Sequence, residues 1–186
     1  EKVLQLARLE KGNIELKKDK VVLLGVLQPL LESTRMQVEQ RGGELKVDLE
    51  TLDGVVVVAD RLHLSNILYS LLDNALKYSN EQPLIAVSGE WKDKRILLKV
   101  ADNGIGISPT HQARIFDKFY RVPTGNVHNV KGFGLGLYYV KRICQAHAWQ
   151  IDLDSEPGRG TTFEILLGKA VTARQPIPAP SPALPE

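Results

Sequence analysis

Apolar residues recur at helical spacing in three segments of this chain, residues 21–41, 60–79 and about 135–147. Side chains at i, i+3, i+4 and i+7 share one face of an α-helix, and such an apolar face is buried against a core. We therefore predict three amphipathic helices. The apolar stripe of the central helix consists of Leu64, Ile67, Leu68, Leu71, Leu72 and Ala75.

Prolines refine the helix predictions. Pro29 lies inside the first predicted helix and indicates either a kink or a late start, because proline lacks the N–H of a helical hydrogen bond. Residues 108–120 are predicted to form a further short helix, with Ser108 as its N-cap and Pro109 at its first position.

Short apolar or alternating runs between the helices predict strands. Tight turns join two pairs of these strands, which we therefore expect to be antiparallel hairpins. Helices that pack on one side of a mixed, mostly antiparallel sheet form a two-layer α+β sandwich, and this is the predicted fold class. The predicted strands cover residues 13–18, 44–50, 55–59, 83–92, 95–101, 149–155 and 161–167.

The pattern divides the chain into a body, residues 13–168, and two extensions. Residues 1–12 carry a short apolar stripe that stops at Gly12, and we expect them to be the last turns of a longer helix. Residues 169–186 hold five of the ten prolines and are predicted to be an extended, disordered tail. The only methionine is Met36, so we expect the chain to be a piece of a longer protein.

Composition excludes several classes of protein. The net charge is +2 with acidic and basic residues interleaved, which favours neither a nucleic-acid partner nor a membrane surface. No apolar run approaches the roughly 20 residues that span a bilayer. Cys144 is the only cysteine, so no internal disulfide forms and a cytoplasmic location is expected.

The stretch "DNGIGIS" (102–108) follows an apolar strand directly. A carboxylate accepts hydrogen bonds only, so Asp102 suits a ligand amino group such as that of adenine. Gly104 and Gly106 would let the main chain approach a flat ring. An ordinary tight turn after a strand explains these residues equally well when they are taken alone.

The stretch "KGFGLGL" (131–137) places glycines at alternate positions where a helix begins. Exposed amides at a helix N-terminus bind anions. The preceding segment, residues 121–131, has no helical or strand-like apolar period and is predicted to be a loop. Nearby basic residues could add cationic contacts to a polyphosphate. The alternative is a glycine-rich hinge with solvated basic residues, and no phosphate loop of the G-x-x-x-x-G-K-[ST] type is present. The residues concerned are Gly132, Gly134 and Gly136, with Lys118, Arg121 and Lys131.

A polar face flanks the apolar stripe of the central helix. Ser70, Asn74, Lys77 and Tyr78 share it by their spacing. An asparagine carbonyl suits Mg²⁺, and a lysine can neutralise a phosphate. For Asn74 alone, the ordinary polar flank of an amphipathic helix is the better interpretation. In the last hairpin, Thr161 or Thr162 can offer a hydroxyl to the same site.

The order of five motifs resembles the catalytic and ATP-binding domain of bacterial sensor histidine kinases, which belong to a superfamily with gyrase and heat-shock chaperone ATPases. The resemblance covers roughly residues 13–168 and implies a Bergerat-type sandwich that holds ATP between its layers. The motifs are "LLDNALKYS" (71–79), "DNGIGIS" (102–108), "IFDKFYR" (115–121), "GFGLGLYYVK" (132–141) and "GRGTTF" (158–163).

The resemblance implies a role for individual residues. Asn74 falls on the Mg²⁺ ligand, Asp102 on the residue that reads adenine, and Arg121 on a lid arginine near the phosphates. Asn74, Lys77 and Arg121 are the implied catalytic residues. Thr162 falls near the adenine edge. The remaining implied ATP contacts are Lys77, Tyr78, Gly104, Gly106, Ile107, Lys118, Phe119, Lys131, Gly132, Gly134, Leu135, Gly136 and Leu137.

The resemblance also implies partners. ATP would donate its γ-phosphate to a histidine on a preceding dimerisation domain, and the phosphate would pass to a response regulator. The full-length protein is expected to be a homodimer, either soluble or anchored in the inner membrane, and this chain a monomer. Two alternatives stay open: an ATP-hydrolysing mechanochemical domain, and a nucleotide-binding module without phosphotransfer. Ser70 stands where hydrolysing relatives have a glutamate base, which disfavours the first alternative.

Overall fold

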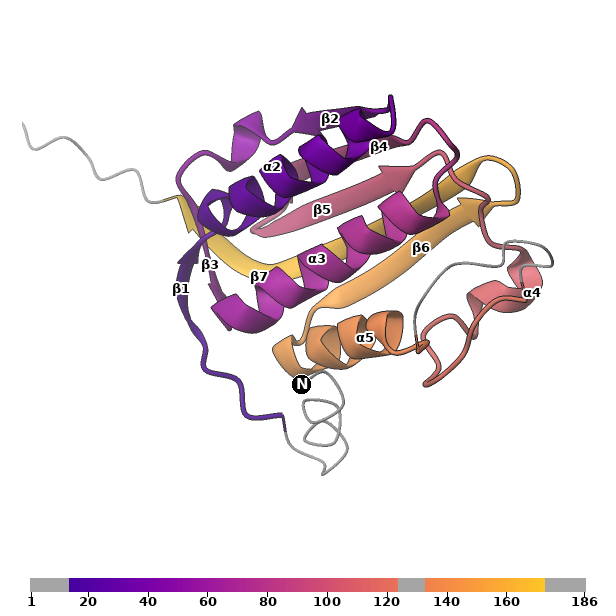
Figure 1. The fold of residues 1–186 in the computed structure, drawn as a ribbon. Coiled ribbons are helices and arrows are strands. Elements are labelled where there is room, and N and C mark those ends of the chain that lie inside the picture. Colours follow the sequence, from indigo (N-terminus) through magenta and orange to yellow (C-terminus); the bar gives the residue numbers. More distant parts are fainter. Residues whose placement is uncertain (1–13, 124–132, 173–186) are drawn as a thin grey trace, which may run out of the picture.

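The computed structural model describes residues 14–123 and 133–172 and contains a seven-stranded sheet with helices packed on one face (Figure 1). The predicted α+β sandwich is confirmed. The strands are β1 (Asp19–Val22), β2 (Glu44–Asp48), β3 (Val55–Ala59), β4 (Leu84–Lys92), β5 (Arg95–Asp102), β6 (Gln150–Glu156) and β7 (Gly160–Thr172). The helices are α2 (Leu24–Gln40), α3 (Arg61–Tyr78), α4 (Pro109–Gln112) and α5 (Gly136–His147), with a 3-10 turn at Glu50–Leu52.

The long strand β7 organises the sheet. The strand order is β1-β3-β7-β5-β4-β2, and β6 also pairs with β7. β2 and β4 are parallel, and the other pairs are antiparallel. The prediction of a mixed, mostly antiparallel sheet is therefore confirmed. The first residues of β7 pair with both β5 and β6, so three strands meet beside the Asp102 end of β5.

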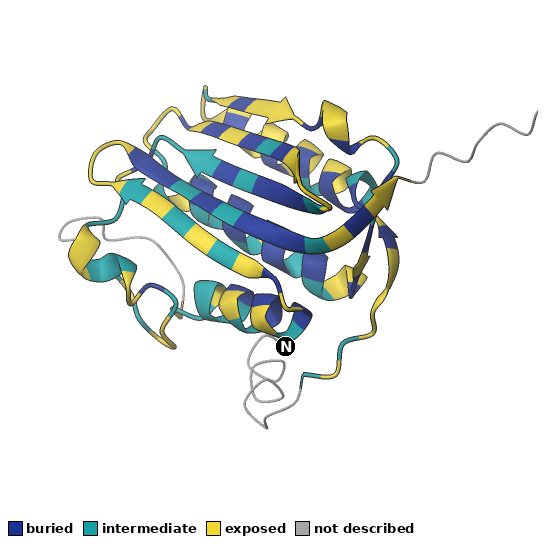
Figure 2. Ribbon diagram, turned by 180° about the vertical axis from the view of Figure 1, so that it is seen from behind, coloured by how far each residue is buried: buried dark blue, intermediate teal, exposed yellow. Residues whose placement is uncertain are grey.

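Three helices cover one face of the sheet, whereas no helix of the described residues covers the opposite face (Figure 2). All six residues of the predicted α3 stripe are buried, with exposures of 0–3%. Ile96, Leu98 and Val100 of β5 are buried with them, and their even spacing sets which face of the strand meets the helices. Asp102 continues that series, so its side chain belongs to the helix-facing side.

Asp60 joins three parts of the fold at the start of α3. Its carboxylate caps the helix by accepting hydrogen bonds from the amides of Leu62 and His63, both at 3.1 Å, and it also accepts from Lys17 N at 2.8 Å. Burial acts to raise the pKa of Asp60, but these backbone hydrogen bonds outweigh it and the pKa is lowered. The Asp60 amide donates to Nε2 of His147 at 3.0 Å, which ties α5 to the same point.

Pro29 lies inside α2, which begins at Leu24, so the predicted alternative of a late start is wrong. The proline leaves the carbonyl of Gly25 without its helical donor. Arg61 supplies a replacement, because its Nη2 donates to that carbonyl at 3.2 Å.

Three predicted boundaries differ from the structure. The strand predicted at 13–18 is displaced to β1, where Val21 is buried against β3. The helix predicted at 108–120 ends at Gln112, and the chain continues in tight turns until Phe119, whose φ of 64° is not helical. Residues 169–172 of the predicted tail belong to β7, since residues 170–172 pair with β3. Residues 1–12 lie outside the described residues.

Candidate nucleotide-binding site

The turn after β5 packs against the end of α3. The amide of Ile105 donates to the carbonyl of Tyr78 at 3.1 Å, and the amide of Gly104 donates to Oδ1 of Asp102 at 2.8 Å. A Cβ on Gly104 would collide with the Tyr78 carbonyl and approach Asp102 Oδ1 to 2.7 Å. Glycine is therefore required here, and it brings Asp102 beside the polar end of α3.

The same turn contacts the β6–β7 hairpin on its other side. Gly106 has a φ of +68°, and a Cβ there would collide with the carbonyl of Glu156. The amide of Gly158 donates to the carbonyl of Ile105 at 2.9 Å. Three motifs that are separated in sequence, at 71–79, 102–108 and 158–163, thus meet at one end of the sheet.

The carboxyl group of Asp102 is half-buried. Burial raises the pKa of Asp102, and hydrogen bonds from the amides of Gly104 and Thr161 oppose this only in part. A buried carboxylate retains lone pairs that only a donor can satisfy. This environment suits the amino group of a bound base.

The register of β7 assigns the nearby hydroxyl to Thr161. Thr161 is the cross-strand partner of Asp102, whereas Thr162 is paired with Ala101. Because side chains alternate along a strand, Thr162 points to the opposite face of the sheet. The register therefore favours Thr161 over Thr162 as the residue that offers its hydroxyl near Asp102. The sequence held a signal for this, since the apolar residues Phe163 and Ile165 follow Thr161 at alternate positions.

Asn74, Tyr78 and Ser70 are half-buried on the predicted polar face of α3. The side chain of Asn74 forms no hydrogen bond with residues 14–123 or 133–172. Lys77 instead pairs with Asp73, with Nζ and Oδ2 2.5 Å apart. Asp73 was not among the predicted site residues, and the i, i+4 spacing to Lys77 is the signal that would have indicated it.

The start of α5 contacts the turn at Phe119. The amide of Phe119 donates to the carbonyl of Gly134 at 3.0 Å. Gly134 has a φ of +67°, and a Cβ there would lie 2.8 Å from a backbone carbon of Phe119. A Cβ on Gly136, by contrast, would meet no atom of the described residues within 4 Å. The structure thus brings the turn at Phe119 and Gly134 together.

The first turn of α5 carries no side-chain cap. Its N-cap residue is Leu135, and no acidic residue occurs in the first turn. The first amides of a helix have no intrahelical acceptor, so an anion can bind there. Leu137, the next residue after Gly136, is half-buried. The predicted contacts Lys131 and Gly132 lie outside the described residues, as do residues 124–131 of the predicted loop 121–131.

Two basic residues of the predicted site lie at the turn that precedes this segment. Lys118 has its Nζ 4.8 Å from the centroid of the Phe119 ring. Arg121 is exposed immediately after the turn. Ile107 is half-buried, and its amide donates to Ser155 Oγ at 2.8 Å.

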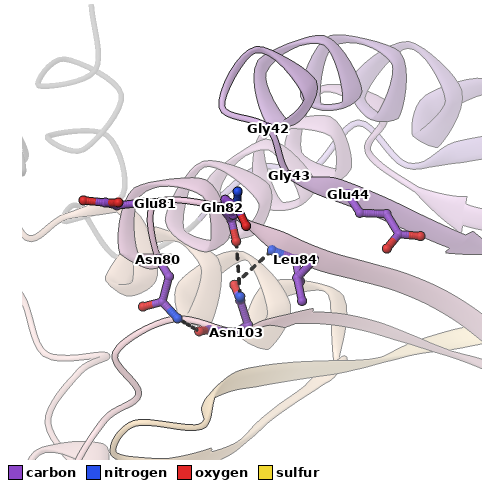
Figure 3. Close-up of a pocket in the computed structure, with 8 residues that line it drawn as sticks. All are labelled: Gly42, Gly43, Glu44, Asn80, Glu81, Gln82, Leu84 and Asn103. Atoms are coloured by element: carbon purple, nitrogen blue, oxygen red, sulfur yellow. Dashed lines mark hydrogen bonds between the residues drawn. The ribbon is translucent and has the colours of Figure 1, made fainter.

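A separate hollow of about 680 Å³ lies beside Asn103, between the loop from α3 to β4 and the loop from α2 to β2 (Figure 3). None of the predicted site residues lines it. The Asn103 side chain accepts from Leu84 N at 2.9 Å and donates to the Gln82 carbonyl at 3.3 Å, while Asn80 Nδ2 donates to the Asn103 carbonyl at 2.7 Å. These bonds hold the loop from α3 to β4 against the Asp102 turn.

Comparison with known proteins identifies the family. A family model described as histidine kinase-, DNA gyrase B- and HSP90-like ATPase matches residues 59–171, more than half of the chain. The chain belongs to this family of ATPases.

Relatives narrow the class. Sensor protein RprX of Bacteroides fragilis is 38% identical over 169 residues, 90% of this chain and 32% of that protein. Sensor protein SrrB of Staphylococcus aureus is 30% identical over 167 residues, 90% of this chain and 28% of that protein. This chain therefore spans about a third of the length of these curated relatives.

Solved structures agree with the relatives. Full-length ShkA in complex with AMPPNP has a TM-score of 0.77 and 28% identity, covering 92% of this chain and 36% of that one. The mycobacterial sensor histidine kinase MprB has a TM-score of 0.68 and 25% identity, covering 81% and 97%. The predicted recognition of an ATP-binding catalytic domain of the sensor histidine kinase type is confirmed.

Proposed function

We propose that the full-length protein transfers the γ-phosphate of ATP to a histidine on a preceding dimerisation domain, and that a response-regulator aspartate receives it next. The observation that carries this proposal is that the Asp102 turn packs on the polar end of α3, while the start of α5 lies toward the same end of the domain (Figure 1). A full-length homodimer with a cytoplasmic catalytic domain follows from the same assignment. No helix within the described residues is long and apolar enough to cross a membrane.

In this proposal the base lies against the Asp102 turn. The carboxylate of Asp102 accepts a hydrogen bond from the exocyclic amino group of adenine. Gly104 and Gly106 leave the main chain bare where the ring would approach. The half-buried side chain of Ile107 contributes apolar surface to the same region.

The phosphates lie toward the start of α5. Uncapped amides at the helix N-terminus bind a phosphate, and the helix dipole favours its charge. Gly136 leaves open space there. Lys118 and Arg121 add positive charge from the adjoining turn. Lys77 acts through its ion pair with Asp73, which positions it at the end of α3.

Asn74 suits an Mg²⁺ ion that also binds phosphate. Its amide oxygen is not engaged by another described side chain, and no cluster of three acidic, histidine or cysteine residues occurs among the described residues. A site with one protein oxygen fits Mg²⁺, which usually keeps several waters and binds substrate phosphates. When bound, the ion would neutralise charge on the phosphates.

The chain's own contribution to phosphoryl transfer is positioning. The reaction depends mainly on alignment and charge stabilisation. The residues named above hold base and phosphates, and the acceptor imidazole has to come from the dimerisation domain. Ser70 lies on α3 one turn before Asn74, and a serine hydroxyl is a poor general base for activating water. Transfer to histidine is therefore favoured over hydrolysis.

Calorimetry with a non-hydrolysable ATP analogue tests the site, with and without Mg²⁺. Wild-type chain should bind the analogue more tightly with Mg²⁺, and Asn74→Ala should lose this dependence while it keeps Mg²⁺-free binding. Asn66→Ala is the matched control, because Asn66 lies on the same helix and its amide donates to Tyr139 instead. An equal Mg²⁺ effect in wild type and Asn74→Ala would remove Asn74 from the site.

A further inference from the structure

Three polar residues lie in one cross-strand row at the candidate base site. Asp102 of β5 is paired with Thr161 of β7, and Thr161 is paired with Ser155 of β6. Cross-strand partners share a face of the sheet, so all three side chains are on the helix-facing side. Ser155 was not predicted from the sequence to belong to the site. It stands behind Thr161 as seen from Asp102.

The hydroxyl of Ser155 has three hydrogen-bond partners. Its Oγ lies 2.8 Å from the amide nitrogen of Ile107, 2.9 Å from the carbonyl oxygen of Gly160 and 2.9 Å from Oγ1 of Thr161. The hydroxyl has one hydrogen and two lone pairs. The amide can only donate and the carbonyl can only accept, so the single hydrogen of Ser155 belongs to Gly160.

The direction of the remaining hydrogen bond follows. Ser155 has no second hydrogen, so the contact between the two hydroxyl groups is satisfied only when Thr161 donates to Ser155. Thr161 then presents lone pairs alone to its surroundings. Asp102 likewise only accepts, and its Oδ1 already receives the amide of Gly104. The two polar side chains of this row that face the base site, Asp102 and Thr161, therefore both act as acceptors.

We propose that Ser155 is a positioning residue that sets the specificity of the base site by fixing the hydroxyl of Thr161 as an acceptor. This inference rests on the proposed function. An acceptor-only site favours a base with an amino group at C6, such as adenine. It disfavours a base with a carbonyl at C6, because two oxygen lone pairs would then face each other. Without Ser155, the Thr161 hydroxyl can rotate and donate to that carbonyl.

Gln112 provides a matched control for a purely structural role. Its Nε2 donates to the carbonyls of Ile107 and Ser155, both at 2.8 Å, so it ties the same loop to the same strand. It has no contact with the Thr161 hydroxyl. If Ser155 only held the loop, substitutions at Gln112 and Ser155 would have similar effects on every nucleotide.

The test compares ADP with inosine diphosphate, which carries a carbonyl at C6, by calorimetry. Wild type should prefer ADP by at least about tenfold. Ser155→Ala should narrow this preference severalfold, and Gln112→Ala should weaken both nucleotides alike and leave the preference intact. In a Thr161→Val background, which lacks the hydroxyl, Ser155→Ala should change the preference no further. Thermal unfolding establishes that each variant is folded.

Two results would overturn the inference, and they are distinguishable. If Ser155→Ala weakens ADP and inosine diphosphate by the same factor, Ser155 has a structural role only and the base site stands. If wild type itself binds both nucleotides equally, the assignment of the base to the Asp102 turn is wrong, and the role of Ser155 falls with it.

Discussion

At the scale of single residues, the negative charge of Asp102 in the candidate site lowers the stability of the folded chain, because the carboxylate is partly buried. Burial raises the pKa of Asp102, so its charged form is less favourable in the folded chain than in the unfolded chain. By linkage, a carboxyl group with a raised folded pKa leaves stability unchanged below its unfolded pKa, lowers it as the pH rises through that value, and has its full effect above the folded pKa. An ionisable residue that lowers the stability of the folded protein in this way is typical of a binding site.

Asp102→Asn separates binding from stability. The amide oxygen can still accept from Gly104, but the amide NH₂ then faces the amino group of adenine, donor against donor. We expect ATP affinity to fall roughly ten- to a hundredfold, as for loss of a hydrogen bond to a charged group. The free energy of unfolding at pH 7 should stay the same or rise. Calorimetry and denaturant unfolding measure the two quantities.

Asp152→Asn serves as the control for this change, because it removes the same charge from an exposed position on β6. It should alter neither ATP affinity nor stability measurably. Unchanged ATP binding by Asp102→Asn would show that Asp102 does not contact the base.

His147 makes the fold sensitive to acid. Its Nε2 accepts from the Asp60 amide, and its Nδ1 is 3.0 Å from the carbonyl of Ile143, so the neutral ring with hydrogen on Nδ1 satisfies both bonds. Burial lowers the pKa of His147 below the usual 6.5. A histidine with a lowered folded pKa stabilises the fold above its unfolded pKa, and that stability is lost as the pH falls through the folded pKa.

We therefore expect the free energy of unfolding to decrease below about pH 6.5, by at most about 1.4 kcal/mol per pH unit from this group. His147→Gln keeps a donor and an acceptor without an imidazole to titrate. Urea unfolding at several pH values should give a smaller acid loss for the variant than for wild type. Equal losses would mean that other groups cause the acid sensitivity.

The sequence alone predicts only some of the residues that form the candidate site. Asp102, Gly104 and Gly106 could be predicted because they follow a strand directly and because their motif is distinctive. Thr161 and Ser155 could not be assigned with the same ease, because strand register decides which of two neighbouring hydroxyl groups faces the helices. Helical positions are more readable, since the i, i+4 spacing of Asp73 and Lys77 already implies their contact.

At the scale of elements, the start of α5 and the turn at Phe119 behave as one unit. Two backbone features join them, the hydrogen bond from Phe119 to Gly134 and the close approach of their main chains. The same turn shows why the helix predicted over 108–120 cannot extend to its last residues, because Phe119 takes a positive φ where it contacts Gly134. Local propensity favours a helix at Phe119, and this tertiary contact overrides it.

Gly134 and Gly136 offer a matched pair of substitutions. Gly134→Ala puts a side chain at a φ of +67° and against Phe119, so it should lower both stability and ATP affinity. Gly136→Ala meets no atom of residues 14–123 or 133–172 and adds helix propensity, so the melting temperature of this variant should not fall. If phosphate occupies the open space, ATP affinity should still fall severalfold. Thermal unfolding and calorimetry on both variants check this.

Full ATP affinity in Gly136→Ala would exclude phosphate from the space next to that residue. Unchanged stability in Gly134→Ala would mean that the turn at Phe119 adapts without cost.

At the scale of the whole molecule, the sheet and its helical layer were predictable because each amphipathic element buries one continuous face. The stripe of α3 and the alternation of β5 specify the same interior from opposite sides. The ends of the body were less predictable. Residues 169–172 join the sheet because β3 offers them a partner strand, and this pairing is not visible in the local composition.

At this scale the question is whether a histidine of the chain could itself accept the phosphate, and each described histidine is engaged at one ring nitrogen or more. His147 is buried and bonded at both ring nitrogens. Nδ1 of His63 lies 2.7 Å from the hydroxyl of Tyr139, and Nδ1 of His111 lies 2.5 Å from that of Tyr120. Each of these contacts holds the histidine ring against a tyrosine of the same domain. His128 lies outside the described residues and does not occur in an acceptor motif.

We therefore predict that the 186-residue chain binds ATP without phosphorylating itself. In-line transfer needs an imidazole aligned with the γ-phosphate, and the proposed acceptor belongs to the preceding dimerisation domain. With γ-labelled ATP, this chain should stay unlabelled. A chain extended upstream to include that domain should gain acid-labile, base-stable label, as a phosphoramidate does, and Asp102→Asn in the extended chain should suppress it. Near-stoichiometric label of that kind on the 186-residue chain would show instead that one of His63, His111, His128 and His147 is the acceptor.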